Sequence, residues 1–369
     1  MKSLLLITCL AAGYTATAQN RTPGDTLRSP LSSGPGKALI RLYAPKASEV
    51  KLVGDFTRTP IALTSDGQGI WKTEIGPLRP DYYTYTLIVD GVRTLDPKNA
   101  SIKQGIASVE NVVLIPGSET AFEDVQNVPH GELRQVWYSS STLGRMRRMH
   151  VYTPPGYEKG RDSYPVFYLL HGAGDDDSGW STIGRAGFIF DNLIAAGKIK
   201  PMVVVMPNGS MPTEPGTPLN MSRMRDLFSS ELLKDILPRV EAGYRVKTSP
   251  ADRAIAGLSM GGFQTLDVVL SRPELFTYAG VFSSGFFGPS IDEAETKYSK
   301  SLNDKDFNSK KKLFWIGIGK DDFVMEANRK TLALLDKHQI RYQYKETEGG
   351  HTWINWRQYL NEFTPMLFR

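Results

Sequence analysis

The stretch that decides the fold is Gly257–Gly261, which reads Gly-Leu-Ser-Met-Gly. It follows a strand-like run, 252–257, and precedes a helix-like run, 262–270. A serine at a sharp strand-to-helix turn occupies strained backbone, and small residues two positions before and after it let the chain turn without a side-chain clash. In this setting the stretch predicts a nucleophile elbow, with Ser259 presented at the edge of an α/β sheet.

A histidine must take the proton of such a serine, and in this fold the acid and the histidine follow the serine along the chain. Of the five histidines, His338 and His351 lie beyond Ser259. His338 ends a helical pattern, which is typical of a solvated helix-end residue. His351 stands in a glycine loop, 348–353, after an expected strand, and a loop can bring an imidazole to the serine. We therefore predict His351 as the catalytic base, the alternative being a surface-loop histidine.

The acid is expected after the apolar run Leu313–Gly319, which is typical of a parallel strand covered on both faces. Asp321 and Asp322 follow this run, and either carboxylate could accept the imidazole N–H and stabilise the imidazolium. The spacing Gly319-x-x-Asp322 favours Asp322. Asp321 is then an exposed turn residue or a helix N-cap.

The oxyanion of an acyl-transfer reaction needs two backbone N–H donors, one from the residue after the nucleophile and one from the loop after the third strand. Met260 supplies the first. The buried strand expected at 165–170 ends in a loop where Ala173 is the predicted second donor. His171 precedes the serine and is expected to pack or hydrogen-bond beneath this loop.

The acidic run Asp175–Asp177 could indicate a calcium-binding loop. An EF-hand loop would need a bidentate glutamate at its twelfth position, which here is Ala186. We therefore expect a solvated acidic loop, and neither a metal nor an organic cofactor.

The N-terminal residues 1–18 have the order of a secretory signal peptide, with cleavage expected after Ala18. This segment contains the only cysteine, Cys9, for which a lipid anchor is the alternative. No later apolar stretch approaches the ~20 residues of a membrane span. The net charge of +5 is dispersed, and the short run Lys310–Lys312 predicts a solvated loop and no nucleic-acid site.

The chain is long enough for two domains. Residues 19–36 are rich in Pro, Ser and Gly and predict a flexible leader. Residues 37–116 contain short alternating segments with turns between them, at 38–43, 49–53, 69–74, 82–89 and 112–115, which predicts a small β-sandwich. Residues 117–130 are expected to be a linker. From 131 to 369 strands alternate with helical patterns, at 188–198, 229–241, 262–271, 325–338 and 354–367, which predicts a parallel α/β sheet.

From Gly131 to its end the chain resembles carbohydrate esterase family one, the esterase D-like α/β hydrolases that include feruloyl and acetyl xylan esterases. The matching segments are 151–157, 168–172, Trp180, 201–209, 257–262, 319–323 and 350–357. The resemblance implies an α/β-hydrolase fold in which Ser259, Asp322 and His351 form the triad. One departure is Gly187, where related sequences often have Asn, so a polar contact near the acyl pocket is expected to be missing.

The region 37–116 is similar to the early-set immunoglobulin-like modules of carbohydrate-binding family forty-eight. The similarity is carried by 53–56, 66–71, 83–85, 89–91 and Asp96-Pro97. Such modules bind α-glucans in some enzymes and act as spacers in others. Trp71 lies in a strand whose alternation points it inward, which favours a core residue over a stacking platform. Because every residue assigned to chemistry lies beyond Gly131, turnover of small esters is expected without this region.

The resemblances imply a serine carboxylic ester hydrolase that forms an acyl-enzyme, and the expected signal peptide implies that it is secreted or periplasmic. The expected partners are feruloyl or acetyl esters of plant cell-wall polysaccharide, with hydroxycinnamoyl esters preferred. Trp180 and Trp353 are candidate substrate contacts, as are Phe286 and Phe287, unless each is a core residue. Two alternatives remain: an esterase of macrocyclic siderophores such as enterobactin, and a catalytically silent carbohydrate-binding protein.

Overall fold

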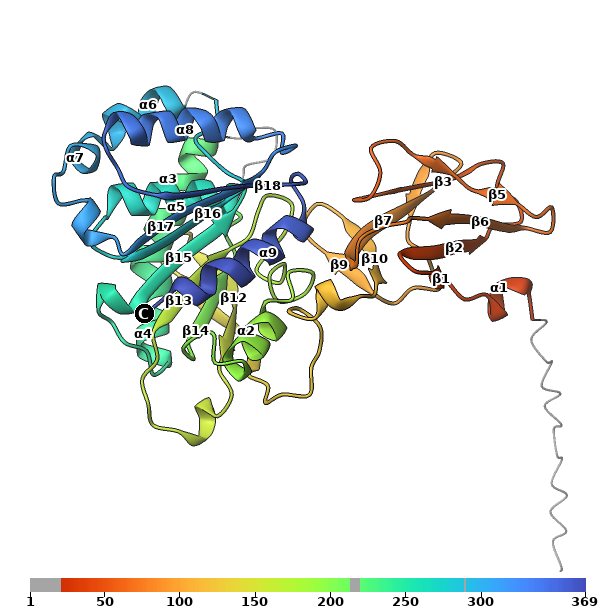
Figure 1. The fold of residues 1–369 in the computed structure, drawn as a ribbon, viewed down its shortest axis with the longest axis horizontal. Helices are drawn as coiled ribbons and strands as arrows, with labels where there is room; N and C mark the ends of the chain where they lie inside the picture. Colours follow the sequence, from red (N-terminus) through yellow and green to blue (C-terminus); the bar gives the residue numbers. More distant parts are fainter. Residues whose placement is uncertain (1–20, 213–219, 289) are drawn as a thin grey trace, which may run out of the picture.

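The computed structural model of the protein describes residues 21–212, 220–288 and 290–369. The predicted signal peptide, 1–18, and Cys9 lie outside these residues. The chain forms a smaller part made almost entirely of strands and a larger part in which helices surround a sheet (Figure 1).

The smaller part is a pair of sheets that share one core. One sheet has the order β1-β2-β6-β5, the other has the order β4-β3-β7-β10-β9, and β8 pairs with β7. Alternate residues of β2 are buried, as expected for strands with one face toward a core. The elements are α1 (Pro23–Thr26), β1 (Leu31–Gly34), β2 (Lys37–Tyr43), β3 (Val50–Gly54), β4 (Ile61–Ala62), β5 (Thr64–Ser65), β6 (Ile70–Ile75), β7 (Asp81–Val89), β8 (Val92–Thr94), β9 (Ile102–Gln104) and β10 (Val109–Ile115).

Two details of this part bear on the sequence predictions. Residues 31–34 are not a flexible leader, because Leu31 and Ser32 pair antiparallel with Leu39 and Ala38 and add an edge strand to the first sheet. The indole N–H of Trp71 donates to the carbonyl oxygen of Ala44 at 3.0 Å, and its ring packs partly buried against the core.

The larger part contains an eight-stranded sheet with the order β11-β12-β14-β13-β15-β16-β17-β18. The pairs β11–β12 and β12–β14 are antiparallel, and all the other pairs are parallel. The predicted parallel sheet is therefore present, with two antiparallel strands added at one edge. The strands are β11 (Glu132–Ser140), β12 (Arg145–Thr153), β13 (Val166–Leu170), β14 (Val203–Pro207), β15 (Arg253–Leu258), β16 (Tyr278–Phe282), β17 (Leu313–Gly319) and β18 (Gln343–Thr347).

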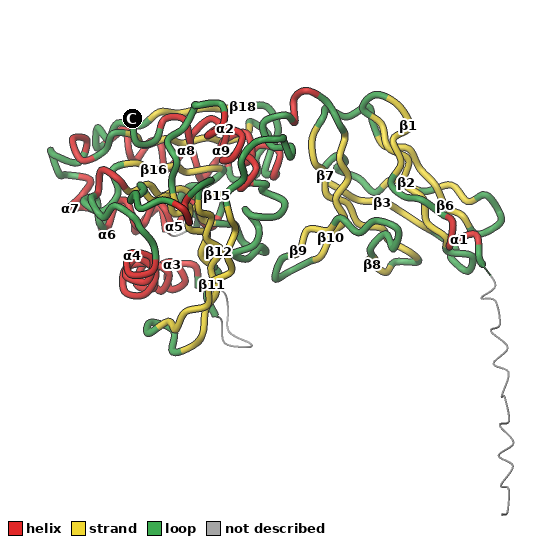
Figure 2. The backbone as a smooth tube through the Cα atoms, turned by 90° about the horizontal axis from the view of Figure 1, so that it is seen from below, coloured by secondary structure: helices red, strands yellow, loops and turns green. Residues whose placement is uncertain are grey.

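Helices cover both faces of this sheet (Figures 1 and 2). Successive residues of a strand point to opposite faces, so Tyr168 of β13 joins one core while Phe167 and Leu169 join the other. One face is covered by α3 (Met221–Glu231), α4 (Leu237–Gly243), α5 (Met260–Ser271), α6 (Ser290–Lys297), α7 (Ser299–Leu302) and α8 (Met325–Lys337), and the other by α2 (Ala186–Ala195) and α9 (Trp353–Phe363). A π-helical turn, Leu232–Ile236, joins α3 to α4, and short 3-10 turns lie at Ser118–Thr120, Tyr157–Lys159, Pro250–Asp252, Asn308–Lys310 and Thr364–Met366.

A buried ion cluster joins the two parts. The guanidinium of Arg357 on α9 is fully buried, pairs with Asp81 of β7, and lies 2.6 Å from a carboxylate oxygen of Glu123. Burial raises the pKa of Glu123 to about 7, although Arg357 opposes the shift. Glu123 belongs to the predicted linker 117–130, so this segment is packed against the larger part. Among the described residues, no helix is long and apolar enough to cross a membrane.

Candidate active site

Ser259 lies between the last residue of β15 and the first residue of α5, as the sequence predicts. Its backbone has φ 51° and ψ −114°, a conformation that non-glycine residues rarely adopt. The turn is held by its neighbours: the N–H of Ser259 donates to the carbonyl oxygen of Phe282 at 2.9 Å, and the hydroxyl of Ser284 donates to the carbonyl oxygen of Ser259 at 2.6 Å. A Cβ on Gly257 would lie 2.3 Å from the carbonyl carbon of Gly261. The glycine is therefore required for the turn to close.

Asp322 and His351 form a hydrogen-bonded pair. The Nδ1 atom of His351 lies 2.9 Å from Oδ1 and 3.0 Å from Oδ2 of Asp322. The Asp322 carboxylate is fully buried, and its Oδ1 also accepts the backbone N–H of Val324 at 3.0 Å. Asp321 is exposed and makes no such contact; its backbone N–H donates to the carbonyl oxygen of Gly349 at 2.9 Å. Of the two candidate aspartates, Asp322 is the one that meets the histidine.

The three residues lie at one edge of the sheet. Ser259 follows β15, Asp322 follows β17 and His351 follows β18. The strands β15, β16, β17 and β18 are consecutive and parallel in the sheet. Their carboxyl ends therefore meet at the same edge, where open α/β sheets hold their ligands. Because Nδ1 of His351 faces a carboxylate, Nε2 is the nitrogen that remains to accept a proton.

The loop after β13 passes directly beside the serine. A Cβ on Gly172 would lie 3.3 Å from Cβ of Ser259, and the exposed Ala173 follows. Met260 is the first residue of α5, and the N–H groups of a helix's first turn have no partner within the helix. The peptide groups of Ala173 and Met260 thus belong to the two segments that border Ser259.

His171 fixes the base of this loop, as predicted. Its Nε2 accepts the backbone N–H of Gly209 at 2.8 Å, which leaves Nδ1 to donate to the carbonyl oxygen of Gly172 at 2.8 Å. Burial lowers the pKa of His171 and keeps the ring neutral, which suits one donor and one acceptor. The side-chain amide of Gln264 donates to the carbonyl oxygen of Gly209 at 2.8 Å and extends this support to α5.

Trp180 and Trp353 are core residues in the structure. Trp180 has no exposed surface, and its indole N–H donates to the carbonyl oxygen of Leu170 at 2.9 Å. Trp353 is 5% exposed and packs edge-on against Trp180. The expectation that they contact substrate is therefore wrong for this structure, because neither ring presents a face to solvent. Phe286 is 1% exposed, but it borders a surface hollow beside Phe287.

The aromatic surface beside the histidine belongs to Phe323, which the sequence analysis missed. Its side chain is 79% exposed, and its ring centroid lies 4.4 Å from that of His351. Phe323 and Phe287 line a surface hollow of about 300 Å³ together with Ile291 and Val324. Its position directly after Asp322 is the sequence feature that could have predicted a place beside the histidine.

The expectation of a solvated acidic loop is wrong for Asp175 and Asp177, which are both buried. Arg148 pairs with Asp177 at 2.7 Å, and Lys103 of the smaller part pairs with Asp175 at 2.8 Å. These cationic partners offset part of the cost of burying the carboxylates. Within the described part of the chain, no group of three or more His, Cys, Asp or Glu side chains is placed to hold a metal ion.

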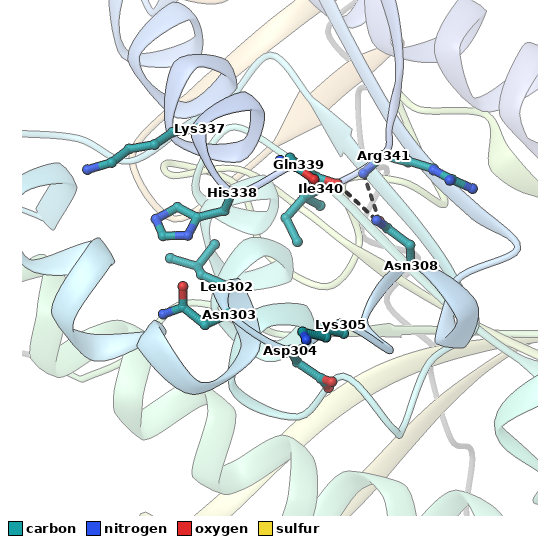
Figure 3. A pocket seen from close by; sticks show the side chains of 10 residues that line it. All are labelled: Leu302, Asn303, Asp304, Lys305, Asn308, Lys337, His338, Gln339, Ile340 and Arg341. Carbon is teal, nitrogen blue, oxygen red and sulfur yellow. Dashed lines mark hydrogen bonds between the residues drawn. The ribbon is translucent and has the colours of Figure 1, made fainter.

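His338 lies away from this edge of the sheet. It caps the end of α8, and its Nε2 lies 3.1 Å from a carboxylate oxygen of Glu295. It also lines a surface hollow of about 610 Å³ that contains none of the three candidate catalytic residues (Figure 3). The geometry therefore separates His338 from the site.

Comparison with solved structures identifies the fold. The fold is that of α/β-hydrolase esterases: a ferulic acid esterase from Anaeromyces mucronatus has a TM-score of 0.59 and 23% identity, covering 69% of this chain and 96% of its own. The enterobactin esterase of Shigella flexneri has a TM-score of 0.68 and 16% identity, covering 89% of this chain and 92% of its own. At these identities the likeness shows the fold.

The family follows from the sequence comparison. The family model named Esterase matches residues 140–367, and the chain belongs to this family. The chain is also 32% identical over 348 residues to an endo-1,4-beta-xylanase/feruloyl esterase of Xylanibacter ruminicola, an alignment that covers 92% of this chain. It spans 46% of the length of that relative. Together these findings support a carboxylic ester hydrolase.

Proposed function

We propose that the protein is a serine carboxylesterase with Ser259 as nucleophile, His351 as base and Asp322 as the residue that orients the base. The observation that carries this proposal is the strained serine turn at the same sheet edge as the hydrogen-bonded Asp322–His351 pair. A serine, a histidine and a carboxylate in these roles are sufficient for acyl transfer without a metal.

In the proposed reaction the Ser259 hydroxyl oxygen bonds to the ester carbonyl carbon while its proton passes to Nε2 of His351. The N–H groups of Met260 and Ala173 stabilise the negative charge on the carbonyl oxygen. The carbon–oxygen bond to the alcohol then breaks, and the alcohol leaves with the proton from His351. Water repeats these steps on the acyl-enzyme, releases the acid and restores the serine. Asp322 stabilises the imidazolium formed in each half.

The proposed substrates are esters of hydroxycinnamic acids, such as feruloyl groups on plant hemicellulose, with acetyl esters as the alternative. The relative from Xylanibacter ruminicola carries the name of a feruloyl esterase. The exposed ring of Phe323 and the hollow that it lines with Phe287 offer apolar contact to a flat acyl group near His351. Gly187 counts against a hydroxycinnamoyl group, because its hydrogen side chain offers no polar contact to the ring substituents.

We further propose that the smaller part is an immunoglobulin-like module of the carbohydrate-binding type and that the chain is exported through the signal peptide at 1–18. The two-sheet core of residues 31–115 supports the first proposal. Cell-wall polysaccharide lies outside the cell, which is why export suits the proposed substrate.

A siderophore esterase is the second candidate, because the likeness to the enterobactin esterase fold extends over 89% of this chain and so includes the smaller part. A substrate panel separates the candidates: kcat/KM is measured for methyl ferulate, acetylated xylo-oligosaccharide and ferric enterobactin. We expect methyl ferulate to rank first. A higher value for acetylated xylan or for ferric enterobactin would refute the substrate assignment and leave the esterase assignment standing.

The esterase assignment itself is tested with Ser259→Ala. The variant should keep the fold and lose at least about 10⁴-fold in kcat on p-nitrophenyl acetate, because the acyl-enzyme can no longer form. Activity within tenfold of the wild type would reject Ser259 as the nucleophile. A wild-type protein that binds xylan oligosaccharide but hydrolyses no ester would instead support the silent binding protein.

A further inference from the structure

The hairpin of β9 and β10 in the smaller part lies against the loop that carries Ala173. The backbone N–H of Ala107, in the turn of this hairpin, donates to the carbonyl oxygen of Gly174 at 3.3 Å. The Nζ atom of Lys103 on β9 lies 2.8 Å from Oδ1 of Asp175. In both views the hairpin lies on the side of the smaller part that faces the larger one (Figures 1 and 2).

The ion pair of Lys103 and Asp175 is removed from solvent. The two side chains are 11% and 7% exposed, and Glu110, the cross-strand partner of Lys103, adds a second carboxylate at 3.4 Å. Burial alone would lower the pKa of Lys103, but the two carboxylates outweigh it and raise the pKa, so the lysine is charged. A buried pair of this kind holds its members in place, because separating them leaves an uncompensated charge.

The two backbones also approach each other closely at Gly105. A Cβ on this residue would lie 2.3 Å from the carbonyl oxygen of Gly174 and 3.2 Å from Oδ1 of Asp175. Glycine is therefore the one residue that lets the hairpin reach the loop in this position. A methyl group here would have to displace the loop or the hairpin.

Ala173 lies between two anchors of different origin. The residue before it, Gly172, is held by His171 from within the larger part. The residues after it, Gly174 and Asp175, are held by the hairpin. The direction of a peptide N–H depends on the chain on both sides, and a displacement of about 1 Å in an active site can cost ~10²-fold in rate.

We propose that Lys103 and Gly105 are positioning residues for the reaction: through Asp175 and Gly174 they set the direction of the Ala173 N–H that stabilises the oxyanion. This inference rests on the function proposed above. It replaces the expectation that the smaller part is dispensable for small esters, since this part contacts the loop on one side of Ala173.

The test compares Lys103→Met, Lys103→Arg and Gly105→Ala with the wild type on p-nitrophenyl acetate. Oxyanion contacts are stronger in the transition state than in the ground state, so we expect kcat to fall at least about tenfold in Lys103→Met and Gly105→Ala with KM nearly unchanged. Lys103→Arg keeps the charge and should recover most of the activity. Phenylboronic acid, which forms a tetrahedral adduct on serine, should bind more weakly in step with kcat.

The matched control is Lys51→Met, which removes a half-buried lysine of strand β3 in the same sheet that pairs with Glu49, and it should leave kcat unchanged. Gly105→Ala keeps every charge, so it tests the inference even if Lys103→Met fails to fold. If kcat stays at the wild-type value in Gly105→Ala and Lys103→Met, or if KM alone changes, the positioning role is wrong. An active Ser259→Ala variant would instead remove the proposed function on which this inference rests.

Discussion

Replacing Asp322 by asparagine should disable the proposed base while changing one atom. In the wild type, Oδ1 accepts the N–H of Val324 and both carboxylate oxygens face Nδ1 of His351. The amide oxygen of an asparagine should stay with Val324, which leaves the NH₂ group at the position of Oδ2, 3.0 Å from Nδ1. An NH₂ donor at this distance favours the tautomer in which Nδ1 accepts and the proton is on Nε2, in competition with the tautomer in which Nδ1 still donates to the amide oxygen at 2.9 Å.

A histidine protonated on Nε2 cannot accept the proton of Ser259. We therefore expect Asp322→Asn to lose about 10⁴-fold in kcat, which corresponds to about 5.4 kcal/mol of activation free energy at about 1.36 kcal/mol per factor of ten. Because the side chain is fully buried and the replacement has nearly the same volume, the fold should be retained.

The assay is kcat on p-nitrophenyl acetate between pH 6 and 9, with circular dichroism as the check on folding. Asp321→Asn is the matched control, since its side chain is exposed and makes no contact with His351; its kcat should stay within about twofold of the wild type. A folded Asp322→Asn variant with a kcat within tenfold of the wild type would refute the tautomer argument, and a larger loss in Asp321→Asn would show that the other aspartate serves the base.

Three further predictions follow from single contacts. His351→Ala should match the serine variant in kcat, whereas His338→Ala should leave kcat nearly unchanged; equal losses would contradict the site. Arg357→Met should lower the unfolding free energy in urea by about 3–5 kcal/mol, because it leaves two buried carboxylates unpaired, and a loss below about 1 kcal/mol would contradict this. Burial alone would raise the pKa of Asp235, but hydrogen bonds from Ser141 and Thr142 lower it to about 2, so its stabilising contribution is present above pH ~4 and lost toward pH 2. The difference in melting temperature between wild type and Asp235→Asn should therefore shrink as pH falls from 4 to 2, and a constant difference would refute the assignment.

The sequence predicted the helices and strands in which apolar residues recur with a regular spacing. The strand expected at 82–89 is β7, Asp81–Val89, and the helix expected at 325–338 is α8, Met325–Lys337. In β7 the alternate residues Tyr83, Tyr85 and Leu87 join the core, and in α8 the buried residues have helical spacing, so the local sequence indicates both elements. Helix α6, Ser290–Lys297, was not predicted because Ser290 and Ala294 are its only buried residues and no apolar stripe marks it.

The start of the helix expected at 229–241 was predicted wrongly because the helical segment contains a π-helical turn. The helical segment begins at Met221, where the side chain of Asn220 accepts the N–H of Arg223 at 2.9 Å. It continues through the π-helical turn Leu232–Ile236 to Gly243. The extra residue in that turn shifts the phase of the apolar stripe, so the sequence shows a regular period over part of the segment.

Some features of the candidate site could be predicted from the sequence, and others could not. Chain order and strand ends were enough to predict Ser259 and to bring Asp322 and His351 together, because parallel strands put these residues at one edge. The burial of Asp175 and Trp180 could not be predicted, since it depends on partners far along the chain. The lysine that neutralises Asp175 lies 72 positions before it, on a three-residue strand with no alternation to mark it.

These long-range contacts argue against the smaller part being only a spacer. A spacer would be expected to touch the larger part through an exposed and variable surface, as connecting segments usually do. Here one contact is the buried cluster around Arg357, on the helix that starts two residues after His351, and another is the hairpin against the loop of Ala173. The smaller part therefore reaches the chain segments on both sides of Ser259, the one that carries the proposed base and the one that carries the proposed oxyanion donor. A rigid support of this kind is what a preorganised oxyanion site requires, because its donors must already point at the charge when it forms.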